Sequence, residues 1–220
     1  MGGSMTRADS ALPEPPADLT GFPSQRIEPD RKLWRAVQAP NPDRWGAWWF
    51  SSNGGRFDLP NPLGTCYLAT DVKAAIRERL GRVFRIGSLL PESLMHAMEL
   101  AEVQLPHPVE VADTGHESAA DWGAIRELGS VTGSYAKTVR WAQAFQQASF
   151  GGVLYEPRFS SRAEASAVGV FDAAGAKPWP EGARLSGQEA FTLTGLDKFV
   201  AVIPSSKAAK IIAPPPPVRR

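Results

Sequence analysis

The chain has 220 residues, 43% of them hydrophobic, and a formal net charge of +1 at pH 7. That length is enough for one sizeable core, and the near-neutral charge implies no general attraction to nucleic acid or to an anionic membrane. The single cysteine excludes an intrachain disulfide, and because neither a signal-peptide pattern nor an apolar run of about 18 residues is visible, the sequence predicts a cytoplasmic protein without a membrane partner.

The first 30 residues are expected to lack a core of their own. Residues 1–4 are typical of an expression-vector remnant before a natural start at Met5. Residues 5–30 contain repeated prolines and few large apolar side chains, which predicts an extended arm along the domain or along a partner. Residues 204–220 are rich in Lys and Pro and predict a tail. We therefore expect one domain over residues 31–203.

A strand is predicted over residues 32–37, and it places a charge in an unusual position. Side chains alternate between the faces of a strand, so Arg35 shares a face with Leu33 and Val37. A guanidinium among apolar neighbours needs a partner, which makes Arg35 a candidate for ligand binding. The tryptophan-rich loop over residues 41–50 either stacks on a ligand or packs into the core, and packing is favoured because aromatic side chains dominate core burial.

The rest of the chain is expected to be arranged around residues 54–81. This stretch comprises a loop that carries Arg56, a strand over residues 65–69, and a helix that begins at the polar Thr70 and ends at Gly81. It therefore forms a strand-to-helix corner.

The helix of this corner carries a carboxylate, Glu78. At 100° per residue, one helix face is shared by Val72, Ala75, Ile76 and Leu80. Glu78 lies at the edge of this face, half sheltered and near enough to the end of the strand to meet a ligand held by Arg56. The alternative is that Glu78 forms a surface ion pair with Arg82 at i+4.

Further helices and strands follow this corner. Helices are predicted over residues 91–101, 119–128 and 134–150, and strands over residues 108–113, 152–156, 165–171 and 198–203. The apolar arc is clearest in the helix that includes Tyr135. Residues 174–196 are rich in Gly, Pro and Ala and give no clear pattern.

Several chemistries lack their usual motifs. The three histidines, His96, His107 and His116, have neither the spacing nor the accompanying ligands of a metal site. The chain contains no GxGxxG after a strand, no GxxxxGK[ST] and no GxSxG. Cys66 alternates with Tyr67 across its strand and is interpreted as a small buried thiol.

Two arginines near strand ends, one helical glutamate and the tyrosines Tyr67, Tyr135 and Tyr155 remain. Arginine binds phosphate through bidentate, charge-assisted hydrogen bonds. A carboxylate stabilises the positive charge that develops on a ribose as its leaving group departs. These groups suit a ligand with phosphates and a ribosyl bond to be broken, and NAD has both.

Five motifs occur in an order that resembles the RES domain family. They are Leu33-Trp34-Arg35-Ala36, then Gly55-Arg56-Phe57-Asp58, then Tyr67-Leu68-Ala69 with Ala74-Ala75-Ile76-Arg77-Glu78, then Ser134-Tyr135-Ala136-Lys137-Thr138 with Trp141-Ala142, and last Gly152-Val153-Leu154-Tyr155 with Arg158-Phe159. The resemblance covers about residues 30–172. The family is named for an arginine, a glutamate and a serine.

The resemblance implies an α+β fold, a single domain with a split mixed β-sheet flanked by helices, similar to that of ADP-ribosyltransferases. It also implies a bacterial toxin of a type II toxin–antitoxin pair that acts on NAD. Members of the family degrade NAD, some by phosphorolysis with inorganic phosphate, and at least one branch transfers ADP-ribose to a protein. The usual partner is an antitoxin with an Xre-like DNA-binding region that occludes the site.

Two of the three residues that name the family have counterparts here. The arginine falls on Arg35 or on Arg56, and the glutamate falls on Glu78. The family typically has Tyr-x-Ser-Arg where this chain has a Tyr-Glu-Pro-Arg run ending in Arg158, so Pro157 occupies the serine position. Proline has no hydroxyl, so a hydrogen bond to phosphate or ribose is lost unless Ser160 or Ser161 supplies it.

The residues and the resemblance together predict an enzyme that consumes NAD as its substrate, without a metal. The catalytic residues are expected to be Glu78 and Arg35, and the substrate-binding residues Arg56, Tyr67, Tyr135, Arg158 and Ser160. Arg35 and Arg56 are expected to hold the pyrophosphate, Tyr67 or Tyr135 to stack on the nicotinamide, and Glu78 to stabilise an oxocarbenium-like transition state. The alternatives are ADP-ribosyl transfer to a protein or nucleic acid, and an inactive member kept as a binding module. The oligomeric state, a homodimer included, is left open.

Overall fold

An eight-stranded mixed sheet runs through the computed structural model, which describes residues 12–39, 46–52, 54–84, 89–124, 126–130, 134–160 and 166–202, without the side chains of Arg82 and Glu127. Its strands, in spatial order, are β1 (Ser24–Ile27), β7 (Val109–Asp113), β8 (Gly152–Tyr155), β9 (Ala167–Ala173), β4 (Leu63–Ala69), β2 (Leu33–Gln38), β6 (Met98–Val103) and β11 (Glu181–Ser186). Among the described strands of this sheet, only β7 and β8 are parallel. Two small sheets pair β3 (Trp49–Phe50) with β10 (Gly175–Ala176) and β5 (Leu90–Pro91) with β12 (Val200–Ala201).

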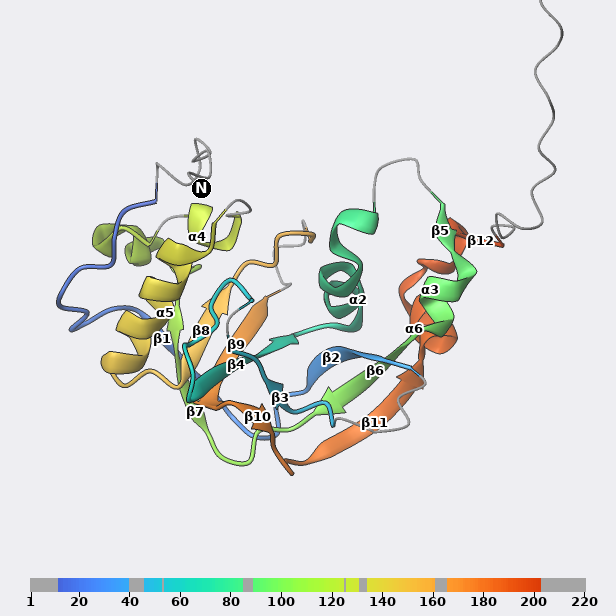
Figure 1. Cartoon of the computed structure of the whole chain (residues 1–220), viewed down its shortest axis with the longest axis horizontal. Helices are drawn as coiled ribbons and strands as arrows, with labels where there is room; N and C mark the ends of the chain where they lie inside the picture. Colours follow the sequence, from blue (N-terminus) through green and yellow to red (C-terminus); the bar gives the residue numbers. More distant parts are fainter. Residues whose placement is uncertain are drawn as a thin grey trace, which may run out of the picture.

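The large sheet divides between β2 and β4. These neighbours share a single register pair, Trp34 with Ala69, whereas β4 pairs with β9 over its whole length and β2 with β6 over its whole length. The two halves of the sheet therefore diverge beyond this pair, and Figure 1 shows the sheet curving beneath the helices. The predicted α+β fold, a single domain with a split mixed sheet flanked by helices, is confirmed.

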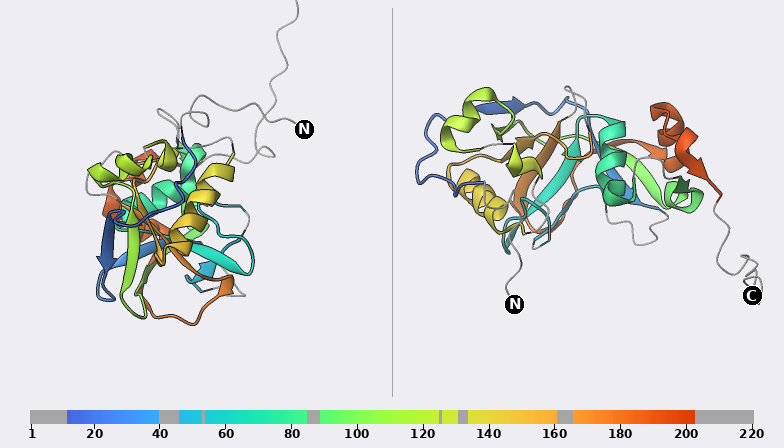
Figure 2. Two further views of the ribbon diagram at one scale, coloured as in Figure 1. Left: turned by 90° about the vertical axis from the view of Figure 1, so that its left-hand side faces the viewer. Right: turned by 90° about the horizontal axis from the view of Figure 1, so that it is seen from above.

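The helices cover the concave side of the sheet (Figures 1 and 2). They are α2 (Val72–Leu80), α3 (Glu92–His96), α4 (Glu127–Ser130), α5 (Ala136–Gln147) and α6 (Gly187–Thr194), with 3-10 turns η1 (Gly81–Val83), η2 (Glu117–Trp122) and η3 (Asp197–Phe199). Alternation along the strands separates two cores: Val153 and Tyr155 pack with α5, while Leu154 between them packs on the other face. A third core joins α2, α3 and α6 to the three-stranded half.

The predicted corner over residues 54–81 forms as expected. The side chain of Asp71 caps α2 by accepting from the N–H of Ala74 at 2.9 Å. The helix ends at Gly81, whose φ of +47° favours glycine and whose N–H donates to the carbonyl of Arg77. In the strand, Cys66 is fully buried in one core and Tyr67 packs against another, so the predicted alternation is confirmed.

The prediction of a helix over residues 91–101 is wrong for its second half. The chain forms α3 and then enters β6 at Met98, which is paired by β2 on one side and β11 on the other. The apolar residues of this segment fit a helix stripe and a strand equally well, and two neighbouring strands decide in favour of the strand.

Two other predicted segments also differ, and one segment without a prediction has regular structure. Residues 119–128 form η2 and the start of α4, because Gly123 interrupts them with a φ of +84°. Of residues 198–203, predicted as a strand, the structure describes residues 198–202, which supply part of η3 and the two-residue β12. Residues 174–196, left unassigned from the sequence, contain β10, β11 and α6, and α6 begins with a reciprocal capping box between Ser186 and Glu189.

The N-terminal arm lies along the domain and contributes side chains to the core of the domain. Leu12, Leu19 and Phe22 are buried, and residues 24–27 form β1 against β7. The indole N–H of Trp141 on α5 donates to the carbonyl of Pro13 at 3.0 Å. The boundary at residue 30 stays a prediction, and the vector remnant and the tail over residues 204–220 lie outside the described residues.

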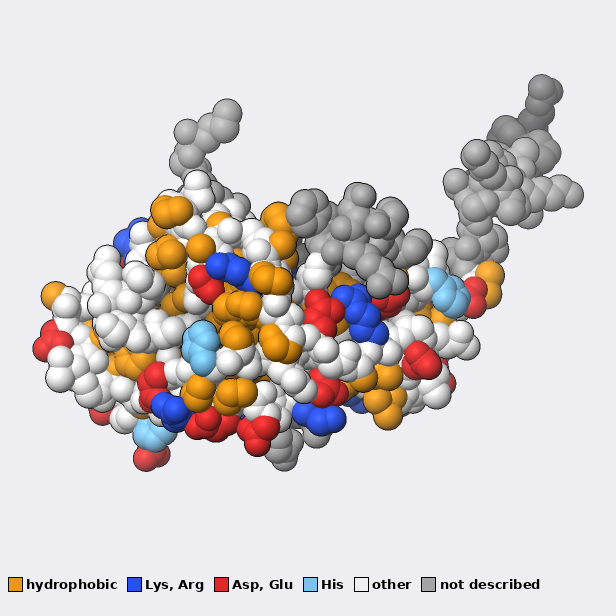
Figure 3. Space-filling model, turned by 90° about the horizontal axis from the view of Figure 1, so that it is seen from below, with side chains coloured by type: hydrophobic (Ala, Val, Ile, Leu, Met, Phe, Trp, Pro, Cys, Tyr) orange, Lys and Arg blue, Asp and Glu red, His pale blue; other side chains and the backbone are white. Residues whose placement is uncertain are grey.

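The convex side carries the tryptophan-rich loop. Trp48 and Phe50 are buried and pack edge-on against Trp179, with ring centroids 4.9 and 5.3 Å apart. Packing, the favoured interpretation of this loop, is thus confirmed for these two residues. From below, hydrophobic side chains gather at the middle of the molecule with charged groups around them (Figure 3). None of the described helices is long and apolar enough to cross a membrane.

We expect Phe22→Ala to lower the free energy of unfolding by about 3–5 kcal/mol. Its ring packs against Trp122, Phe145 and Phe150 at 5.6, 5.1 and 6.1 Å between centroids. Urea denaturation measures the change, and Leu193→Ala, at an exposed side chain, is the control with an expected change below about 0.5 kcal/mol. Equal effects of the two substitutions would show that the arm does not stabilise the domain.

Candidate active site

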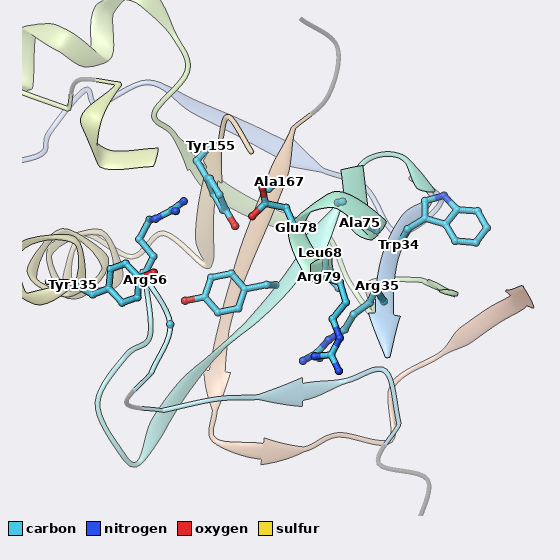
Figure 4. A pocket seen from close by; sticks show the side chains of 14 residues that line it. Trp34, Arg35, Arg56, Leu68, Ala75, Glu78, Arg79, Tyr135, Tyr155 and Ala167 are labelled. Atoms are coloured by element: carbon cyan, nitrogen blue, oxygen red, sulfur yellow. The ribbon is translucent and has the colours of Figure 1, made fainter. Parts of the chain in front are cut away.

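A pocket of 310 Å³ lies where β2 and β4 diverge (Figure 4). Its walls come from β2, β4, the loop before β4, α2, the start of α5, and the ends of β8 and β9. The pocket contains five of the seven predicted site residues: Glu78, Arg35, Arg56, Tyr67 and Tyr135. Segments far apart in the sequence thus meet at the division of the sheet.

Glu78 is half-buried on the pocket side of α2, as the helical pattern predicted. Its Oε1 accepts a hydrogen bond from the backbone N–H of Phe159 at 3.0 Å. This contact fixes the carboxylate, which points toward the Tyr155 side chain in Figure 4. The alternative partner, Arg82, lies outside the side chains that the structure describes.

Tyr155, the last residue of β8, is 5% exposed and lies between Glu78 and Arg56. Burial raises the pKa of its hydroxyl, the negative charge of Glu78 raises this pKa further, and the Arg56 guanidinium opposes them. The hydroxyl therefore stays protonated at neutral pH and is a neutral group beside the carboxylate.

Arg56 carries a buried hydrogen-bond donor without a partner. Its Nε makes no hydrogen bond to the described residues, and its guanidinium carbon lies 5.9 Å from the centroid of the Tyr155 ring. Leaving a buried donor unpaired costs free energy. An anionic ligand beside this guanidinium would supply the missing acceptor.

The loop that carries Arg56 is held by a buried carboxylate, Asp58, which is 2% exposed. Asp58 accepts hydrogen bonds from the N–H of Gly55 at 2.7 Å, the hydroxyl of Tyr67 at 2.8 Å and the hydroxyl of Ser51 at 3.0 Å. At its other side, the Arg56 carbonyl accepts from the hydroxyl of Thr138 on α5. The backbone at Arg56 is therefore fixed from two elements.

Glycine is required at position 55 by close packing. A Cβ there would lie 2.5 Å from Asp58 Oδ1 and 2.8 Å from Tyr67 Cε2. Because both neighbours belong to the network that holds the loop, a larger residue would displace Arg56.

The Tyr67 ring lines the pocket, and its hydroxyl both donates and accepts a hydrogen bond within the protein. It donates to Asp58 and accepts from the N–H of Phe57 at 2.8 Å. Burial raises the pKa of this hydroxyl, and the charge of Asp58 raises it further. Tyr67 therefore contributes an oriented ring rather than a titrating group.

Arg35 has the hydrogen-bond partners that a guanidinium among apolar neighbours requires. Its Nη1 donates to the carbonyls of Ala47 and Trp49, the latter at 2.9 Å, and lies 2.9 Å from Cys66 Sγ. Arg35 still lines the pocket, so it both anchors the aromatic loop and presents a positive charge to the site.

The other two predicted binding residues, Arg158 and Ser160, do not line this pocket. The Arg158 guanidinium lies 4.9 Å from the Phe159 ring centroid, and the Ser160 N–H donates to the carbonyl of Pro157 at 3.2 Å. Ser161 lies outside the described residues. The segment thus presents a backbone N–H to Glu78 instead of a serine hydroxyl.

Three residues of the site, Tyr155, Asp58 and Arg79, were not among the site residues predicted from the sequence, which named Tyr155 only as one of three tyrosines without a specific role. Arg79 follows Glu78 and lies one helical turn after Ala75, so the helical period places all three on the pocket side of α2. Tyr155 ends a strand, but only the fold shows which strand ends meet. No group of three or more His, Cys, Asp or Glu residues suited to a metal occurs in the described part of the chain.

A family model of the RES domain matches residues 32–191. The chain is similar to a chain in the crystal structure of the M. tuberculosis MbcT–MbcA toxin–antitoxin complex, with a TM-score of 0.53, 19% identity, and coverage of 77% of this chain and 92% of that one. No curated protein matches the sequence. At this identity the structural match establishes the fold alone.

We expect Asp58→Ala to lower the free energy of unfolding by about 1–3 kcal/mol, because it leaves the partly buried Gly55 N–H without an acceptor. Urea denaturation checks this value. The matched substitution Asp30→Ala, at an exposed turn, should change stability by less than about 0.5 kcal/mol. A loss no greater than that control would contradict the role of Asp58.

Alkaline pH is expected to destabilise the fold through its buried tyrosines. A raised pKa of Tyr155 in the folded state means that its contribution is complete below the unfolded value of about 10 and is lost as pH rises above it. Each such group adds a slope of about −1.4 kcal/mol per pH unit in that window. Tyr155→Phe should therefore reduce the slope of unfolding free energy between pH 10 and 11 in urea titrations. Identical slopes for the wild-type protein and Tyr155→Phe would refute a raised pKa of Tyr155 in the folded state.

Proposed function

This chain belongs to the RES domain family, and we propose that it is a toxin that consumes NAD by cleaving the bond between nicotinamide and ribose. One observation carries the proposal: a fixed carboxylate and an arginine with an unsatisfied buried donor line the same pocket. These are the two groups that a ribosyl bond and a pyrophosphate require.

Glu78 is proposed to act on the ribose. As the C1–N bond breaks, its electron pair moves to the nicotinamide ring nitrogen and positive charge develops on the sugar. The Glu78 carboxylate, held by the Phe159 N–H, stabilises this charge without reorienting. An oxygen of phosphate or water then bonds to C1, giving ADP-ribose 1-phosphate or ADP-ribose.

The remaining pocket groups are proposed to bind the substrate. The Arg56 guanidinium takes one phosphate through its free donor, and Arg35 contributes charge from the opposite wall. Tyr67 or Tyr135 stacks on the nicotinamide. The locked hydroxyl of Tyr67 favours that ring, because an oriented ring loses little freedom on binding.

Pro157, at the position of the family's serine, offers no hydroxyl to the acceptor that attacks the ribose. Arg158 and Ser160 lie outside the pocket, which weakens their assignment as phosphate ligands. Hydrolysis and phosphorolysis thus both fit the site, and the assay distinguishes them by their products.

A partner is proposed from the structural neighbour, which was solved as a toxin–antitoxin complex. We expect a cognate Xre-like antitoxin to cover this pocket in the cytoplasm and to prevent NAD from entering. A homodimer stays a prediction from the sequence.

We expect Glu78→Gln to reduce nicotinamide release from NAD by about 10²–10³-fold while the chain stays folded. The amide keeps the size of the side chain and an acceptor for the Phe159 N–H, but it removes the negative charge. The assay follows isotope-labelled NAD by chromatography, with and without inorganic phosphate.

Glu28→Gln is the matched control, since Glu28 pairs with Arg26 at the surface. Full nicotinamide release by Glu78→Gln would refute the mechanism. Label on a macromolecule would instead favour ADP-ribosyl transfer, and a folded wild-type protein without any NAD turnover would favour a binding module.

A further inference from the structure

A second pocket, of 550 Å³, adjoins the first and shares Tyr155 with it. It lies between the segment that follows β7, η2, the start of α4 and the end of β8. Strands β7 and β8 are the parallel pair, so their carboxyl ends meet at this edge.

The side chains of the second pocket suit a neutral sugar and a base better than a phosphate. Ala120 and Ala124 supply small apolar surfaces, and His116 supplies an imidazole ring. Two carboxylates, Glu117 and Glu156, also line it. Its arginine, Arg126, already lies 3.7 Å from Glu156 in an ion pair. A phosphate would meet negative charge here, whereas ribose hydroxyls would find acceptors.

Arg56 lines the first pocket and lies against the residue that both pockets share. Its guanidinium lies over the ring of Tyr155, the residue that both pockets share, and in Figure 4 the side chain extends toward that ring. Its Nε is buried without a hydrogen-bond partner among the described residues. An anionic group beside this guanidinium would therefore supply an acceptor to an unsatisfied donor on the Tyr155 side of the first pocket.

We propose that the second pocket receives the adenosine half of NAD, with the pyrophosphate beside Arg56 and the nicotinamide riboside in the first pocket. This inference rests on the proposed NAD-cleaving function. The first pocket, at 310 Å³, lies at the lower end of the about 300–1,000 Å³ that ligand sites span, so it suits one half of a dinucleotide. The adenine stacks on His116 beside Ala120, and Glu117 or Glu156 accepts hydrogen bonds from the ribose hydroxyls.

Ala120→Trp tests this assignment by filling the second pocket. Ala120 is exposed on η2, so the indole occupies the pocket without removing a core contact. We expect the dissociation constant of AMP, measured by calorimetry, to rise at least about tenfold, and KM for NAD to rise similarly with kcat within about twofold. Ala183→Trp, on the exposed β11 at the far end of the sheet, is the control.

AMP should also inhibit NAD cleavage by the unmodified protein competitively, a measurement that does not depend on the folding of a variant. Unchanged AMP affinity in Ala120→Trp, or a raised KM for inorganic phosphate with an unchanged KM for NAD, overturns the proposal; the latter would make the pocket an acceptor site. If the wild-type protein released no nicotinamide but bound AMP in an Ala120-dependent way, the proposed reaction would fail and the adenosine site would stand.

Discussion

The separation of β2 from β4 is the constraint on which the rest of the site depends. Two strands joined by one register pair leave room between them that neither half of the sheet can fill. The helix α2 spans this opening, packing its apolar face on the three-stranded half and turning Glu78 toward the five-stranded half. A continuous sheet would bury this region under side chains, so the division of the sheet is what allows a ligand pocket at its centre.

Some polar groups of the pocket have hydrogen-bond partners within the protein, whereas the Nε of Arg56 has none among the described residues. This difference supports the proposed binding of a phosphate. Asp58 and Tyr67 satisfy each other and the surrounding N–H groups, so they fix the loop. Arg56, which the loop carries, keeps a buried donor without an acceptor. Binding a phosphate would remove that cost, and the loop would not need to reorganise. The same logic applies to Glu78: a backbone N–H orients it, so its orientation does not depend on a hydroxyl at Pro157.

The sequence predicted the corner over residues 54–81 well because its signals are local. A capping aspartate, an apolar face at helical spacing and a terminal glycine act within one turn of the chain. Prediction failed at Met98, where two neighbouring strands override a helix pattern. For the N-terminal arm, the sequence left open what the arm packs against, and the structure buries Leu12 and Phe22 in the core of the domain. Both outcomes depend on contacts with segments more than 50 residues away, which no local pattern contains.

The residue types and their order were enough to identify the family, the α+β class and the candidate residues for a phosphorylated ribosyl ligand. Which of these candidates lie together depended on the three-dimensional fold. It brought Glu78, Arg56 and Tyr155 together, left Arg158 and Ser160 outside, and placed a second pocket against Tyr155. The physical reason is that these side chains come from separate strands and helices, and their distances are set by strand pairing across the divided sheet rather than by spacing along the chain.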